Sequence, residues 1–233
     1  MPEAETPGPD VDGASASLSG KQIADAALAV LDAGGARSLS FEAVAQRLGV
    51  DAAAVRARVG SVAGLERVAI ERVLSSVALG PLADGGVEWT AAVIQFALRV
   101  RGLLFAHPAV AELIMSGPMD SPSADGPVAR EITESLFVCL ARGGLPAPVR
   151  AHGVYAVLVY VLGSIALDVA ETEGKPPLPA ESERIAARRT ALRGLDSSRW
   201  PRTAAHLAEI AAWTSVDQFV WGLRVLLTGM TAT

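Results

Sequence analysis

Apolar residues recur along the chain with the spacing of helices that face a common core. In residues 41–48 they fall at Phe41, Val44, Ala45 and Leu48, which is the i, i+3, i+4, i+7 pattern of one helix face. No segment alternates between apolar and polar residues for long enough to indicate a strand. The pattern therefore predicts an all-α protein.

Four helices are expected near the N-terminus, because cap residues and glycines interrupt the apolar pattern there. Ser19, Ser40 and Asp51 have side chains that can accept the free N–H groups at a helix start. Gly49 lies where the chain needs a left-handed turn. The predicted helices span residues 20–33, 41–48, 52–58 and 62–79.

Longer helices are predicted further along the chain, several of them beginning at or near a proline. Their expected bounds are 89–106, 108–115, 127–142, 148–172 and 215–227. Between the last two, residues 173–200 form a charged insertion that we expect to be flexible, with a surface helix over 180–193. The acidic residues 1–19, rich in proline and glycine, predict a disordered tail.

The spacing between the second and third helices is that of a helix-turn-helix. Ala45 is a small residue where the next helix must cross closely, Gly49 provides the turn, and Val55 fills the space between the two helices. In such a motif the second helix enters the major groove of DNA and the first helix braces it. The alternative is an ordinary helical hairpin with a glycine turn.

Composition limits the class of protein further. The net charge of −5 excludes general coating of nucleic acid, and residues 20–80, with seven basic and six acidic side chains, are only slightly basic. The single Cys139 cannot form an intrachain disulfide, which fits a reducing compartment. The first residues have no basic and apolar secretion signal, so we expect a cytoplasmic protein.

One uncharged run, residues 151–167, reaches the lower length limit for a membrane span. It contains polar side chains, including His152, Tyr155 and Ser164, and it continues directly into a charged segment. A core or interface helix of a soluble bundle is therefore favoured over a membrane helix.

The chain lacks the residue patterns that indicate an enzyme. His107, His152 and His206 are isolated, and none of them forms metal-ligand spacing with Cys139. No nucleophile elbow, P-loop or dinucleotide-binding glycine pattern is present in the sequence. We therefore expect no catalysis, no metal and no cofactor, and a small helical enzyme is the more distant alternative.

The segment "IADAALAVLDAGGARSLSFEAVAQRLGVDAAAVRARVGSVAGLERVAI" resembles the N-terminal domain of the TetR family of bacterial transcriptional repressors. The segments "EWTAAVIQFALRVRGLLFAHPAVAELIMSGP", "VYVLGSIALDVAETEG" and "SVDQFVWGLRVLLTGM" resemble the tetracycline-repressor-type C-terminal domain. The resemblance implies a helix-turn-helix domain over residues 20–66 and a ligand-binding and dimerisation domain over residues 67–233. It also implies a homodimer that binds a palindromic operator and that a small molecule releases from DNA.

The third helix departs from the pattern that the family shows at its DNA contacts. The tyrosine and histidine that usually touch phosphates correspond to Arg56 and Arg58, which can replace those contacts by charge and hydrogen bonding. The alanines at 52–54 offer only methyl contacts to bases. The DNA-contacting residues expected are Ser40, Arg47, Ala52, Ala53, Arg56 and Arg58. The alternative is a TetR-like protein that binds a ligand or a partner but not DNA.

The resemblance further implies an effector cavity and a helical dimer interface in the C-terminal part. The central helices have few charges, which favours a small, largely apolar effector. The cavity residues expected are Phe96, Leu103, His107, Met115, Phe137, His152 and Tyr155, with His152 and Tyr155 making the polar contacts. The interface residues expected are Val157, Leu162, Phe219, Leu223 and Leu226.

Overall fold

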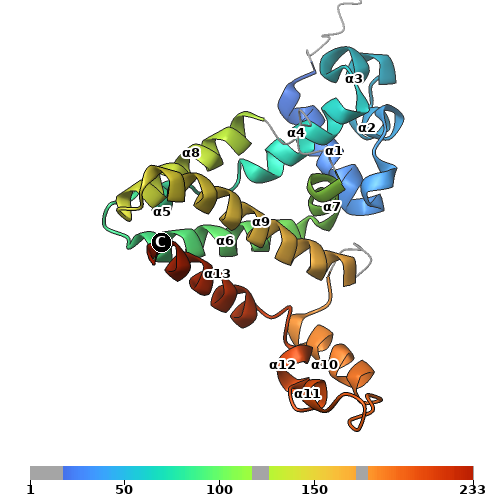
Figure 1. Ribbon diagram of the computed structural model, residues 1–233. Helices are drawn as coiled ribbons and strands as arrows, with labels where there is room; N and C mark the ends of the chain where they lie inside the picture. The colour runs from blue at the N-terminus through green and yellow to red at the C-terminus, as the bar shows by residue number, and fades with distance from the viewer. Residues whose placement is uncertain (1–17, 117–125, 172–177, 233) are drawn as a thin grey trace, which may run out of the picture.

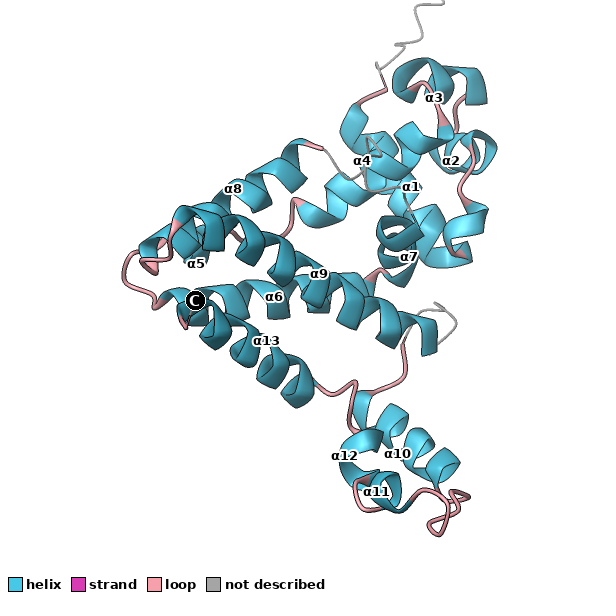
Figure 2. Ribbon diagram, viewed as in Figure 1, coloured by secondary structure: helices cyan, strands magenta, loops and turns pink. Residues whose placement is uncertain are grey.

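The computed structural model describes residues 18–116, 126–171 and 178–232, and within them the structure consists of helices and loops (Figure 2). The all-α prediction is confirmed. Most of the expected disordered tail, residues 1–17, lies outside the described residues. Its last residue, Ser19, caps the first helix, and Leu18 packs against the core.

The N-terminal helices begin at the predicted cap residues. They are α1 (Gly20–Gly34), α2 (Phe41–Leu48), α3 (Ala52–Val59) and α4 (Val62–Leu74), with a 3-10 turn over Ala36–Ser38. The hydroxyl of Ser40 accepts the Ala43 N–H at 3.1 Å, and the carboxylate of Asp51 accepts the Ala53 N–H at 2.7 Å. Each side chain thus satisfies a backbone donor that the helix itself leaves free.

Helix α4 ends at Leu74, five residues before its predicted end. The Ser75 and Ser76 hydroxyls donate to the Arg72 carbonyl at 2.9 and 3.5 Å, which gives this end of the helix side-chain partners. The chain then turns into the short α5 (Gly80–Ala83), whose Leu82 is fully buried.

Four long helices and a shorter one build the body of the molecule (Figure 1). They are α6 (Trp89–Ala106), α7 (Pro108–Ser116), α8 (Pro127–Arg142), α9 (Ala147–Glu171) and α13 (Val216–Thr231). The predicted bounds of α6 and α8 are confirmed. Helix α13 runs one turn further than predicted, and its added Met230 is buried in the core.

The insertion between α9 and α13 forms a helical lobe that projects from the body (Figure 1). It contains α10 (Glu181–Leu192), α11 (Pro201–Ala204) and α12 (Leu207–Ala211). The predicted surface helix is confirmed as α10, whereas α11 and α12 were not predicted. Residues 172–177, the start of the insertion, lie outside the described residues.

The core runs without interruption from the N-terminal helices into the body. Ile23 and Leu31 of α1, Val44 of α2, and Leu104 and Leu136 of the body belong to one cluster of buried side chains. Helix α4 contacts α1 on one side and α6, α7 and α8 on the other. The position of α1–α3 is therefore set by packing against the body.

Helices α6 and α9 are both long and apolar enough to span a membrane on length and composition alone. In this structure the two helices contact each other, and their buried faces, with Phe96 on α6 and Val157 and Ile165 on α9, belong to the core. Core helices of soluble proteins have the same composition.

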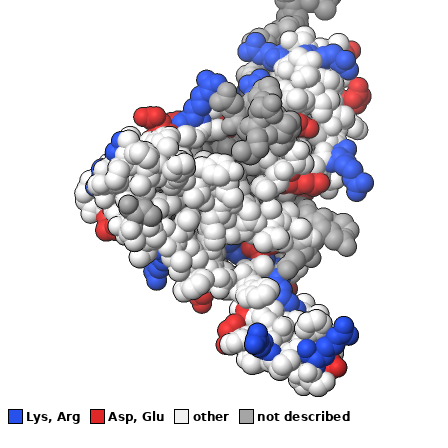
Figure 3. All heavy atoms as spheres, viewed as in Figure 1, with Lys and Arg blue, Asp and Glu red and all other residues white. Residues whose placement is uncertain are grey.

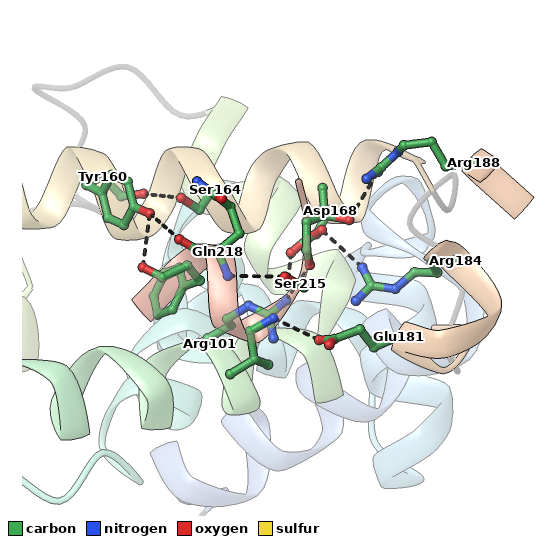
Figure 4. Close-up of polar contacts among 12 residues, drawn as sticks. Arg101, Tyr160, Ser164, Asp168, Glu181, Arg184, Arg188, Ser215 and Gln218 are labelled. Atoms are coloured by element: carbon green, nitrogen blue, oxygen red, sulfur yellow. Dashed lines mark hydrogen bonds and ion pairs between the residues drawn. The ribbon is translucent and has the colours of Figure 1, made fainter. Parts of the chain in front are cut away.

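A buried carboxylate attaches the lobe to the body (Figure 4). Asp168 of α9 binds Arg101 of α6 at 3.0 Å and Arg184 of α10 at 3.1 Å, and all three residues are buried. Burial raises the pKa of Asp168, and the two guanidinium groups oppose that rise. Both guanidinium groups also lie over the ring of Phe105, at 4.2 and 5.4 Å from its centroid.

Replacing Asp168 by alanine leaves two buried guanidinium groups without their carboxylate. We expect Asp168→Ala to lower the free energy of unfolding by about 3–5 kcal/mol, as for other buried ion pairs that lose one partner. Urea denaturation measures this change, and trypsin is expected to cut the lobe faster. Glu183→Ala, which removes an exposed carboxylate of α10, is the control and should have little effect. Equal stability of the two variants would contradict the assigned role of Asp168.

Candidate functional site

Helices α2 and α3 have the geometry of a helix-turn-helix. Ala45 and Val55 are buried where the two helices meet, as their spacing predicted. Gly49 adopts a left-handed conformation (φ 67°), and the Val50 N–H donates to the Ala45 carbonyl at 3.1 Å across the turn. These contacts fix the angle at which α3 leaves α2.

The outward face of α3 is made of methyl groups and guanidinium groups. Ala53, Ala54, Arg56, Ala57 and Arg58 are all exposed. Val50 and Val62, on either side of the helix, are also exposed, at 38 and 42%. Such a face can hold phosphates through its arginines and touch thymine methyl groups through its apolar atoms, but it has few groups that bond to base edges.

The residues predicted to contact DNA differ in how accessible their side chains are. Arg47, on α2, is exposed. The Arg56 guanidinium lies over the Phe41 ring at 4.6 Å, so one of its faces is held against α2. The Ser40 hydroxyl accepts the Ala43 N–H as the cap of α2, and Ala52 packs partly against the core.

Basic side chains gather at two ends of the molecule in the view of Figure 3. One group lies over the N-terminal helices near α2 and α3, and the other lies over the lobe. The surface of the body between them carries few charges in this view. The α2–α3 end therefore combines positive charge with the helix-turn-helix geometry.

The residues predicted to line an effector cavity differ in burial and lie in different parts of the structure. Phe96 of α6 is buried in the core, and Leu103 and Phe137 are partly buried. Met115 of α7 is 44% exposed. His107 follows the last residue of α6, and its Nδ1 lies 2.9 Å from the Asp32 carboxylate of α1. This side chain thus connects the body to the N-terminal helices.

His152 and Tyr155 do not point into the body, in contrast to their predicted role as polar cavity contacts. Both are exposed on α9, and Tyr155 is 59% exposed. The face of α9 that packs inward contains Val154, Val157 and Val161. Because α9 is apolar on several sides, its sequence did not reveal which face is covered.

Open hollows lie between elements of the body and its surroundings. One of them, about 650 Å³, is lined by residues of α6, the start of α10, and Asp32 of α1. A second, about 470 Å³, lies between α6 and α13. A third, about 380 Å³, lies between α7 and α9, and Met115 is among its lining residues together with Ala166 and Val169.

The residues predicted for a dimer interface lie mostly on the inner side of α9 and α13. Val157, Phe219 and Leu223 are 0, 3 and 0% exposed, so they belong to the core of one protomer and are not available to a second copy. Leu162 and Leu226 are partly buried at its edge. The interface therefore stays a prediction, and within one protomer only Leu162 and Leu226 of the five keep some exposed surface for it.

Large apolar side chains lie on the outer faces of α9 and α13, and none of them was assigned to the dimer interface from the sequence. Tyr155 and Val159 are 59 and 49% exposed on α9, and Trp221 and Val225 are 60 and 53% exposed on α13. In each helix the two residues are four apart, so each pair lies on one face, and α9 contacts α13. The signal in the sequence was a second row of apolar residues on each helix, in addition to the row that packs into the core.

The described residues 18–116, 126–171 and 178–232 contain no group of three or more His, Cys, Asp or Glu side chains that could hold a metal ion. Cys139 is a buried free thiol whose pKa burial raises, which disfavours the thiolate.

A helix-turn-helix packed on a body of long helices defines a class of two-part helical transcriptional regulators. Residues 81–233 match the family described as "Tetracyclin repressor-like, C-terminal domain". The chain therefore belongs to the TetR family of transcriptional regulators, a family of regulators and not of enzymes.

Named relatives agree with this family over nearly the whole chain. An HTH-type transcriptional regulator of Saccharopolyspora erythraea is 30% identical over 218 residues, which cover 93% of this chain and 86% of the relative. The solved structure of a TetR regulator from Streptomyces coelicolor is 29% identical, with a TM-score of 0.74 over 92% of this chain and 98% of its own. The Streptomyces coelicolor protein ActR in complex with actinorhodin shares the fold, at 24% identity and a TM-score of 0.76 over 93% and 98% of the two chains.

The junction of α3 and α4 requires glycine at position 64. A Cβ on Gly64 would overlap the Val59 carbonyl oxygen, which is a backbone atom and cannot rotate away. We expect Gly64→Ala to destabilise the protein by about 1–3 kcal/mol, as overpacked sites do. Thermal unfolding measures this loss, and Gly20→Ala, at a helix position with open space, is the matched control. A Gly64→Ala protein as stable as the control would show that the junction is not closely packed.

Proposed function

We propose that this protein is a ligand-responsive transcriptional repressor that binds a palindromic operator as a homodimer and leaves it when a small, largely apolar effector binds. The observation that carries the proposal is the exposed α3 face on a helix-turn-helix, with Arg56 and Arg58 accessible. The family supports it, because the protein's relatives are transcriptional regulators.

DNA binding by this surface relies mainly on phosphates. Arg47, Arg56 and Arg58 supply positive charge near α3, and the stacking of Arg56 on Phe41 reduces the freedom that its side chain loses on binding. The alanines on the outward face add apolar contacts but no hydrogen bonds to bases. Sequence preference then depends in part on the shape and stiffness of the operator.

A second copy of the chain is proposed to cover the outer faces of α9 and α13. Tyr155, Val159, Trp221 and Val225 expose apolar surface on two adjacent helices, and exposed clusters of this kind mark interaction sites. Aromatic residues are also enriched at the centres of protein interfaces. The partly buried Leu162 and Leu226 are proposed to lie at the rim of this interface.

The effector is proposed to be a small molecule bound in the body. The structure of ActR with actinorhodin supports this choice, because it is a TetR-family fold with a small-molecule ligand. The body's interior is apolar between α6, α8 and α9, which favours a largely apolar compound. We assign the protein to the cytoplasm, where its DNA is, and propose no catalytic role.

Removing both arginines of α3 is expected to weaken operator binding and its salt dependence. An operator is first selected from random duplexes with the wild-type protein, and affinity is then measured over a range of salt concentrations. For Arg56→Ala/Arg58→Ala the two copies of the dimer together lose four phosphate contacts, so we expect the slope of log K against log salt to fall by about 4.

The matched control is Arg189→Ala/Arg193→Ala, which removes the same charge from exposed positions of the lobe. The control should keep the wild-type slope. Equal slopes for both double variants would reject α3 as the phosphate-binding element. A wild-type protein that selects no duplex would favour the alternative, a TetR-like protein that binds a ligand or partner but not DNA.

Dimer formation is expected to fail when a charge is placed on the outer face of α13. In Val225→Glu a carboxylate without a partner would be buried between the copies, so we expect the dissociation constant of the dimer to rise by about tenfold or more. Sedimentation velocity measures the change. The control is Val50→Glu in the α2–α3 turn, where the side chain is 38% exposed and far from α13. A dimer unaffected by Val225→Glu would place the interface elsewhere.

A further inference from the structure

A carboxylate of α4 lies at the N-terminus of α8, a helix of the body. The Glu71 Oε2 accepts the Val128 N–H at 3.2 Å. The cap residue of α8 is Gly126, which has no side chain to accept a hydrogen bond, so no side chain of α8 caps its first turn. Glu71 therefore supplies from another helix the acceptor that a serine or aspartate cap would give.

The absence of a side chain at position 126 permits this contact. A Cβ on Gly126 would overlap the Glu71 carboxylate, and the three nearest atoms that it would meet all belong to Glu71. Gly126 has an ordinary extended conformation (φ −70°, ψ 163°), so its backbone does not require glycine. A side chain at position 126 would thus require the Glu71 carboxylate to move away from the start of α8.

The contact is incompletely satisfied. The other carboxylate oxygen, Glu71 Oε1, is buried and has no hydrogen-bond partner among residues 18–116, 126–171 and 178–232. A buried acceptor without a partner costs free energy that is recovered when the group reaches water. The α4–α8 contact therefore rests on one oxygen of the Glu71 carboxylate.

The next residue of α4, Arg72, binds α1, the helix through which α4 contacts the N-terminal domain. The Arg72 Nε lies 2.5 Å from the Asp25 carboxylate of α1, and α4 contacts α1 more extensively than any other element. A displacement of α4 at position 71 is therefore passed to α1, and with it to α2 and α3. The Asp32–His107 pair joins the same α1 to the end of α6, so α1 is also held to the body at a second point.

From these contacts we propose that Glu71 is a positioning residue, which sets the placement of α1–α3 relative to the body by capping α8. Movement of the N-terminus of α8 is then passed through Glu71 to α4 and to the helix-turn-helix. This proposal rests on the proposed function only for the operator-affinity measurement; the distance measurement between α3 and α8 does not depend on DNA binding.

The direct test is a distance between α3 and α8 in the full-length protein. Spin labels are placed at Ala57→Cys and Ala141→Cys, two exposed positions, while the native Cys139 is buried. Labelled protein is diluted with unlabelled protein, so that an assembly carries one labelled copy. The distance distribution is then compared among the unsubstituted background, Glu71→Ala, Gly126→Ala and the double variant Glu71→Ala/Gly126→Ala.

We expect Gly126→Ala and Glu71→Ala each to shift or broaden the distribution. The double variant should match Glu71→Ala alone, because the added methyl group then has no carboxylate to displace. Gly102→Ala, an exposed glycine with open space on α6, and Glu66→Gln on α4 are the controls and should leave the distribution unchanged. A purely stabilising role of Glu71 would lower the melting temperature without moving the distance.

Unchanged distances in folded Glu71→Ala and Gly126→Ala proteins would overturn the proposal. So would a double variant that differs from Glu71→Ala by as much as Gly126→Ala differs from the unsubstituted background. Where the wild type binds an operator, we also expect Glu71→Ala to change its affinity by about 2- to 30-fold, the usual range for contacts that couple two sites. A wild type that binds no duplex would reject the proposed function but leave the distance measurement as a test of Glu71.

Discussion

The packing of α4 between α1 and the body is the constraint on which the arrangement of the molecule depends. One side of the helix contacts α1, and the other contacts α6, α7 and α8. Its inward side chains, Leu65, Ala69, Ile70 and Val73, are buried in a core that both halves share. The helix-turn-helix therefore has no separate apolar interior, and its orientation is decided by the same contacts that stabilise the body.

The lobe is attached by a different kind of interaction. Asp168 is shared between Arg101 of the body and Arg184 of the lobe (Figure 4). The Arg188 guanidinium donates to the Ala211 carbonyl and the Thr214 hydroxyl. Buried ionic contacts are directional and lose much of their favourable energy when displaced, whereas apolar packing tolerates small shifts. The lobe is thus held in one position by few contacts.

The sequence predicted local structure well wherever side chains close a helix end. Ser19, Ser40, Asp51 and Gly49 act through contacts within three or four residues, so their roles are visible in one dimension. Ala45 and Val55 of the helix-turn-helix lie ten residues apart, but the fixed spacing of the motif around Gly49 predicted their burial as well.

Contacts between distant segments were not predictable in this way. Helix α9 has valines and leucines on several faces, so no periodicity distinguished its covered Val157 from its exposed Val159. The interface and effector residues predicted on α9 therefore lie on both its covered and its exposed faces, with Val157 covered and His152 and Tyr155 exposed. The pairing of Glu71 with the start of α8 joins residues 57 positions apart, and neither residue type indicates it.

The alanine-rich face of α3 has a consequence for epigenetic marks on DNA. The methyl group of an alanine side chain can contact the C5-methyl group of thymine in the major groove, which unmodified cytosine lacks. Cytosine methylated at C5 presents the same group at the same place. If α3 lies in the major groove as proposed, the exposed methyl groups of Ala53, Ala54 and Ala57 would meet this C5-methyl group in the same way on either base, so that only the N4 or O4 atom beside it would distinguish the two.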